Sequence, residues 1–174
     1  MKIEYVKKDL FDMPHGYCFV HCISADFALG AGIAKTFDEK YNMRDRLFKM
    51  LDVSLEDIVE VGDVIKVDNV YNLVTKKRCF EKPTYEDFRK AIETLVESVV
   101  EEGITKIAMP KIGAGLDKLD WKIVNAIIKN AFEDVNVDIT VCFLEDDLDF
   151  PNNEDEEAEN DEAEDDYPYG MFTY

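Results

Sequence analysis

Residues 21–34 read HCISADFALGAGIA, and this stretch decides the fold. The apolar run before it predicts a buried strand over 17–22, and a helical stretch follows the glycine turn and continues to about Tyr41. A strand that runs through a Gly-x-Gly turn into a helix directs backbone N–H groups toward an anion. The turn is not a Walker loop, and no third glycine completes GxGxxG. It indicates an anion-binding loop and leaves the ligand open.

Residues 109–117 read MPKIGAGLD and form a second glycine loop, which is again expected between a strand (106–109) and a helix. Two such units on one sheet place two anion-binding loops at its carboxyl edge, where open α/β sheets bind ligands. Two loops suit a diphosphate with a group at each end. The alternative is that both are tight turns in which glycine is merely required.

The other elements alternate along the chain. Further strands are expected over 2–6, 62–67, 69–75 and 137–144, and further helices over 43–51 and 84–102. Thr84 is a good N-cap with Asp87 at N3, and Gly103 ends the helix. Asp120 is expected to cap the last helix. This alternation predicts an α/β sandwich around a mixed or largely parallel sheet. In the helix over 84–102 the inward-facing residues are expected to be Phe88, Ile92, Leu95 and Val99. In the helix that Asp120 caps they are expected to be Trp121, Val124, Ile128 and Ala131.

The negative charge is concentrated near the C-terminus. Residues 145–166 hold 14 of the 39 acidic residues, and the first 144 residues then carry a net charge of only −5 out of −19. We therefore expect a folded domain over 1–144 and a disordered acidic tail over 145–174. Four aromatic residues lie in the last eight. The tail either binds a basic partner or the domain itself, or it serves only solubility.

Composition excludes several classes of protein. No apolar run approaches the roughly 20 residues of a membrane span, and the first residues lack the apolar stretch of a signal peptide. We expect an intracellular protein, cytoplasmic or nuclear, that is a monomer, and a viral or phage source is compatible. The four cysteines form no CxxC pair, and with two histidines they predict no metal site. A mildly acidic domain disfavours a nucleic-acid binder.

The loops, their order and the segment Lys8–Phe11 resemble the macrodomain, an ADP-ribose-binding family. More narrowly, the chain is similar to the terminal ADP-ribose protein glycohydrolase subfamily. The resemblance covers about residues 1–144 and implies a three-layer α/β/α sandwich. The motifs that carry it are His21–Ser24, Gly30–Ala34, Thr75–Arg78, Lys82–Tyr85 and Pro110–Asp117.

The resemblance also implies roles for individual residues. Asp9 matches the aspartate that accepts a hydrogen bond from the adenine amino group, which suits an acceptor-only carboxylate. Lys76 matches the nucleophilic lysine and Asp117 its acidic partner. No cofactor is implied besides ADP-ribose as ligand or substrate. Further contacts with ADP-ribose are implied for Leu10, His21, Ser24, Gly30, Ala31, Gly32, Ile33, Thr75, Pro110, Lys111, Ile112, Gly113, Ala114, Gly115, Leu116 and Leu144.

The chemistry of Lys76 and Asp117 is compatible with these roles. A lysine is a nucleophile only when neutral, and partial burial together with Lys77 and Arg78 favours that form. Asp117 can move protons, or it can activate a water without covalent chemistry. The alternatives are a solvated lysine in a basic triplet and a carboxylate that only starts a helix.

The sequence thus favours a hydrolase that removes mono- or terminal ADP-ribose from acidic side chains of proteins. The same site could deacylate O-acetyl-ADP-ribose or act on ADP-ribose attached to a nucleobase. One alternative is a reader module that binds ADP-ribose without cleaving it, which needs neither Lys76 nor Asp117. Another is a phosphatase for ADP-ribose 1″-phosphate, which would use the same loops.

Overall fold

The computed structural model describes residues 1–51 and 59–144. Residues 52–58 and 145–174 lie outside it, so the predicted disorder of the acidic tail and the role of its aromatic end stay predictions. Within the described part of the chain, no helix is long and apolar enough to cross a membrane.

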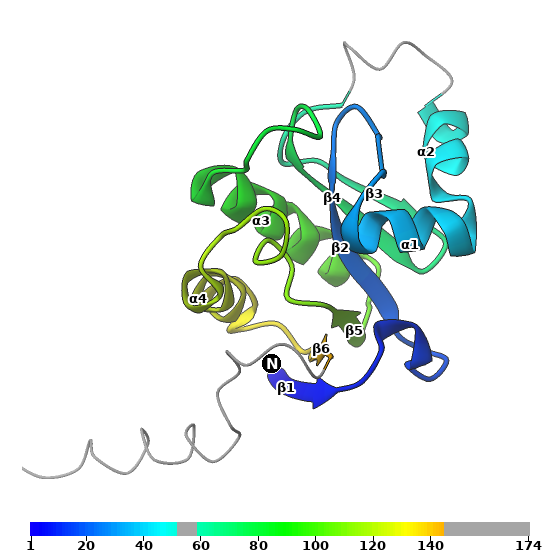
Figure 1. Ribbon diagram of the computed structural model, residues 1–174. Coiled ribbons are helices and arrows are strands. Elements are labelled where there is room, and N and C mark those ends of the chain that lie inside the picture. Colours follow the sequence, from blue (N-terminus) through cyan, green and yellow to red (C-terminus); the bar gives the residue numbers. More distant parts are fainter. Residues whose placement is uncertain (52–58, 145–174) are drawn as a thin grey trace, which may run out of the picture. The chain divides into compact units, whose positions relative to one another are not determined.

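A six-stranded sheet in the order β1-β6-β5-β2-β4-β3 forms the middle of the fold (Figure 1). All neighbouring strands are parallel except β3 and β4. The predicted mixed, largely parallel sheet is therefore confirmed. Along the chain the strands are β1 (Lys2–Lys7), β2 (Cys18–Ser24), β3 (Val64–Val67), β4 (Val70–Lys76), β5 (Lys106–Met109) and β6 (Asp138–Phe143).

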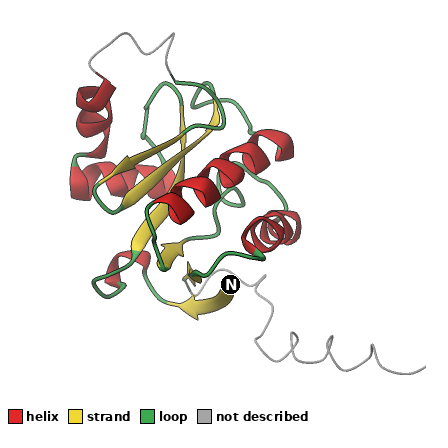
Figure 2. Cartoon of the chain, turned by 180° about the vertical axis from the view of Figure 1, so that it is seen from behind, coloured by secondary structure: helices red, strands yellow, loops and turns green. Residues whose placement is uncertain are grey.

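Helices cover both faces of the sheet, which completes the α/β/α sandwich (Figures 1 and 2). One face carries α1 (Gly32–Tyr41) and α2 (Met43–Leu51), and the other carries α3 (Tyr85–Glu101) and α4 (Trp121–Phe132). A short 3-10 helix, η1 (Leu10–Asp12), follows β1.

The helix caps read from the sequence are present. The Thr84 side chain accepts a hydrogen bond from the Asp87 amide, and Asp120 accepts one from the Lys122 amide. The predicted apolar face of α3 is fully buried. In α4, however, Ala131 is only half-buried. Ile127 and Phe132 contribute buried side chains there instead, because the face that contacts the core extends to both sides of the predicted stripe.

A buried histidine occupies the layer between the sheet and α1. His21 in β2 is fully buried, and its ring stacks on Phe37 of α1 with ring centroids 4.1 Å apart. Its Nε2 lies 2.6 Å from Asn72 Oδ1 on β4. Because Asn72 Nδ2 donates to the Ile65 carbonyl, its Oδ1 is left to accept, and the His21 proton is therefore on Nε2.

This histidine makes stability depend on pH. Burial lowers the pKa of His21 to about 4, against the opposing effect of the Asn72 hydrogen bond. The unfolded chain therefore binds an additional proton as the pH falls from about 6.5 to about 4, and the free energy of unfolding decreases over that window.

We expect His21 to contribute a slope of up to about 1.4 kcal/mol per pH unit in that window. Urea denaturation between pH 5 and pH 7.5 measures it. His21→Gln keeps a donor toward Asn72 without a titrating ring. The variant should therefore lose this part of the slope, because all other titratable groups are the same in the two proteins. Equal slopes in the two proteins would contradict the assignment.

Candidate active site

The predicted site residues follow strands that all end at one edge of the sheet. Asp9 comes after β1, Ser24 ends β2, Lys76 ends β4, Pro110 follows β5 and Leu144 follows β6. These five strands run parallel to one another, so their carboxyl ends share that edge. The topology brings together residues that are up to 135 positions apart in the sequence.

Lys76 and Asp117 form an ion pair at this edge. Lys76 Nζ lies 2.6 Å from Asp117 Oδ1, and the two side chains are only 15% and 13% exposed. The strand register assists, because the pairing between β2 and β4 shifts after Ile23 so that Ser24 lies opposite Lys76. A close, poorly hydrated contact of this kind gives a lysine proton a direct path to a carboxylate.

The loop after β5 presents its backbone in a tight conformation. Gly113 has φ of +74°, and the Leu119 amide donates back to the Gly113 carbonyl. An added Cβ on Gly113 would lie 3.2 Å from the Phe88 ring and 3.2 Å from Leu119. Ile112 is buried, which anchors the loop, whereas Leu116 is 61% exposed at its tip.

The loop after β2 contains two residues in the left-handed region that are not glycine. Phe27 has φ of 49° and Leu29 has φ of 42°, and both side chains are buried in the core. Helix α1 then begins at Gly32, with φ of +56°, and its N-cap residue Ala31 makes no side-chain hydrogen bond to the helix. The first amides of α1 therefore have no side-chain cap, as an anion-binding helix start requires.

The two loops contact each other. The Leu116 side chain lies 3.1 Å from the position that a Cβ on Gly32 would occupy. A third segment supports this contact, because Lys82 Nζ, beyond the end of β4, donates to the Leu116 carbonyl. The structure thus brings the loops after β2, β4 and β5 into one cluster.

The other predicted residues lie at varied depths. Asp9 is exposed and caps η1 by accepting from the Phe11 amide at 2.9 Å, while Leu10 is buried. Thr75 and His21 are fully buried, so they lie beneath the loops rather than at their surface. Leu144 is 61% exposed. Contacts of these residues with ADP-ribose stay predictions.

Three residues near the pair lie in stretches quoted from the sequence but were given no individual role there. Asp26 and Lys82 bind backbone groups of neighbouring loops. Cys22 is half-buried. Burial, and to a lesser extent the negative charge of nearby Asp117, raises the pKa of its thiol, so this thiol lies close to the pair. Only the Ser24-x-Asp26 spacing, typical of a side-chain turn, could have drawn attention to Asp26.

Gly113→Ala should destabilise the protein by about 1–3 kcal/mol, because it forces alanine into a positive φ and against Phe88. Gly115→Ala is the matched control, since an added Cβ there meets nothing within 4 Å. Thermal denaturation of both variants measures the effect. Equal melting temperatures for the two would contradict the packing described for Gly113.

Comparisons with known proteins show which family the chain resembles. The Macro domain family model matches residues 20–128, more than half of the chain. The protein is 43% identical over 145 residues to ADP-ribose glycohydrolase OARD1 of Bos taurus and 41% identical to that of Homo sapiens; each match covers 82% of this chain and 92% of the relative.

Solved structures agree on the fold. The macrodomain of Mycobacterium tuberculosis DarG superposes with a TM-score of 0.72 at 24% identity, covering 80% of this chain and 96% of that one. Together with the family-model match and the mammalian relatives, this establishes that the chain belongs to the macrodomain family.

Proposed function

We propose that this protein is an ADP-ribose glycohydrolase that releases ADP-ribose from acidic side chains of proteins. The observation that carries the proposal is the 2.6 Å contact between Lys76 Nζ and Asp117 Oδ1, which are largely buried at the ligand-binding edge of the sheet. The bovine and human relatives are ADP-ribose glycohydrolases by name, which supports it. A module that only binds ADP-ribose gains nothing from such a pair.

The backbone of the two glycine loops suits the diphosphate. The segment Gly30–Ile33 leads into the uncapped start of α1, and Ile112–Leu116 forms the facing loop. Both offer N–H groups, which bind phosphate oxygens at short range. Asp9, which follows β1, is proposed to accept a hydrogen bond from the adenine amino group. Its carboxylate has further lone pairs besides the one that accepts from the Phe11 amide.

The local charge of the loops favours an anionic ligand although the whole chain is acidic. Residues 76–82 and 110–118 together contain six basic and two acidic residues. Coulomb interactions are screened over about 8–10 Å at moderate ionic strength, so the charges of the loops themselves dominate the attraction of a bound anion. Attraction at short range and general repulsion at long range are therefore compatible.

The pair supports a two-step reaction. Asp117 takes a proton from Lys76, and the freed amine attacks the anomeric carbon of the distal ribose. The bond from that carbon to the side-chain carboxylate breaks, and the electron pair leaves with the carboxylate. Water then cleaves the lysyl adduct with proton transfer through Asp117, which releases ADP-ribose and restores the amine. No cofactor takes part in these steps.

O-acetyl-ADP-ribose carries an acetyl ester on the same ribose, and where the acetyl group is on the anomeric oxygen the same displacement releases acetate, so we include that ester among the substrates. The substrate proteins, the preferred leaving group and any partner of residues 145–174 stay predictions. A reader module and an ADP-ribose 1″-phosphate phosphatase remain the competing functions that the next experiment separates.

Lys76→Ala and Asp117→Ala should each lower the release of ADP-ribose from glutamate-modified protein by about 10²–10⁴-fold, because each removes one partner of the proton transfer. ADP-ribose affinity by calorimetry should change little. Lys122→Ala, an exposed lysine on α4, is the control and should be fully active.

Intact mass spectrometry separates the mechanisms. An ADP-ribose adduct that accumulates in Asp117→Ala supports attack by the lysine. Normal release by Lys76→Ala would remove that step, and wild-type protein that binds ADP-ribose but releases none would identify a reader. Release of phosphate from ADP-ribose 1″-phosphate without action on modified protein would identify the phosphatase.

A further inference from the structure

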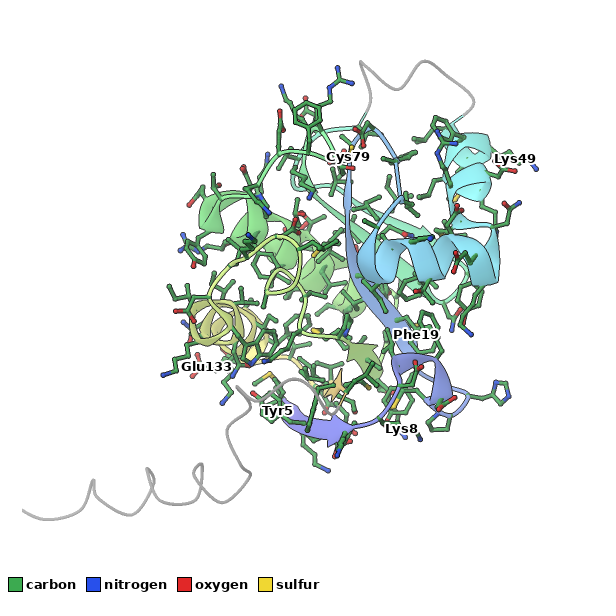
Figure 3. All side chains as sticks on the ribbon, viewed as in Figure 1. Tyr5, Lys8, Phe19, Lys49, Cys79 and Glu133 are labelled. Atoms are coloured by element: carbon green, nitrogen blue, oxygen red, sulfur yellow. The ribbon has the colours of Figure 1, made fainter. Side chains whose placement is uncertain are left out.

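The carboxylate of Asp26 connects the loop after β2 with the loop after β4. Its Oδ2 accepts from the Cys79 amide at 3.0 Å, across 53 positions of sequence. Its Oδ1 accepts from Ser24 Oγ at 2.5 Å and from the Ala28 amide at 3.3 Å. Figure 3 labels Cys79, which lies where the two loops approach each other.

This connection fixes the backbone at Lys76 and just after it. The Ala25 amide donates to the Lys76 carbonyl at 2.9 Å, and Cys79 is held by Asp26 three residues further on. The segment that begins at Lys76 is therefore fixed on one side by residues 25 and 26. On its other side, Lys76 Nζ contacts Asp117.

The loop that carries Asp26 needs such restraint. Phe27 and Leu29 follow it with positive φ values, and a bulky residue in that region costs of order 1–3 kcal/mol. Their buried side chains hold the loop from below, and Arg44 Nε donates to the Phe27 carbonyl at 2.9 Å. The contact with Cys79 extends this restraint from Asp26 into the loop beyond Lys76, in addition to the bond from Ala25 to the Lys76 carbonyl.

A carboxylate suits the position better than an amide would. The groups that face Asp26 are all donors: the Ser24 hydroxyl, the Ala28 amide, and the amide and thiol of Cys79; an ionised carboxylate only accepts. Burial raises the pKa of Asp26, but the hydrogen bonds from Ser24, Cys79 and Ala28 outweigh it, so the pKa lies below its ordinary value. An asparagine would turn its NH₂ group toward at least one donor.

We propose that Asp26 is a positioning residue that, through its bond to the Cys79 amide, holds Lys76 at the geometry needed for attack on the distal ribose. The proposal rests on the hydrolase activity proposed above. Asp26 acts through the loop and does not touch the reacting atoms. Displacing a nucleophile by about 1 Å can cost up to about 10²-fold in rate, so a single loop contact can be decisive.

Two variants remove the contact from opposite ends. Asp26→Asn replaces one acceptor oxygen by a donor, and Cys79→Pro deletes the backbone N–H. Cys79→Ser keeps that N–H and a polar side chain, so it is the matched control. We expect kcat to fall about tenfold in each of the first two, with KM and ADP-ribose affinity within about twofold of wild type. Cys79→Ser should match wild type.

The double variant tests whether the two residues act through one bond. The kcat of the protein that carries both Asp26→Asn and Cys79→Pro should be close to that of either single variant instead of falling about 100-fold. Melting temperatures monitor folding. Multiplicative effects, an unchanged kcat in Asp26→Asn, or losses of affinity in proportion to losses of kcat would each overturn the proposal.

A second readout does not depend on turnover. The rate at which an amine-reactive ester acylates Lys76 can be measured by peptide mass spectrometry. This rate should change at least about threefold in Asp26→Asn and Cys79→Pro and should equal the wild-type rate in Cys79→Ser. If wild-type protein releases no ADP-ribose, the proposed function fails, while the labelling rates still decide the positioning role. Unchanged labelling would contradict that role alone.

Discussion

Parallel alignment of β1, β6, β5, β2 and β4 is the constraint on which the site depends. Parallel strands end on the same side, so every loop that leaves a strand end meets its counterparts there. The shift in register after Ile23 adds a local adjustment that places Ser24 beside Lys76. If β2 instead ran antiparallel to its neighbours β5 and β4, the loop after β2 would lie at the opposite edge of the sheet and could not meet Lys76.

The loops at that edge use burial as well as hydrogen bonding to keep their shape. Ile112 and Phe27 are apolar residues in glycine-containing loops, and both are buried in the domain. Each therefore ties an exposed backbone segment to the rigid interior. The polar groups that remain, Asp26 and Lys82, then need to fix only how one loop lies against the next.

Much of this arrangement could be predicted from local patterns. The Thr84 cap, the apolar stripe of α3 and the two glycine loops depend on short-range spacing, and the roles proposed for Lys76 and Asp117 rest on motif resemblance. The positive φ of Phe27 could not be predicted, because tertiary packing imposes it against the local preference. The bond from Asp26 to Cys79 could not be predicted either, since it depends on the register of β2 with β4. Similarly, the stacking of His21 on Phe37 could not be predicted, since it depends on how α1 packs on β2.

The pairing of β1 with β6 has a consequence for how the chain is made. Lys2 pairs with Asp138 and Lys7 with Phe143, so the first strand of the domain finds its hydrogen-bonding neighbour in the last strand of the domain. Contacts of such long sequence separation form slowly, and an unpaired strand is open to association with other chains. During synthesis β1 therefore lacks this partner until residue 143 has emerged, so the assembly of this domain is completed only once its last strand has been made.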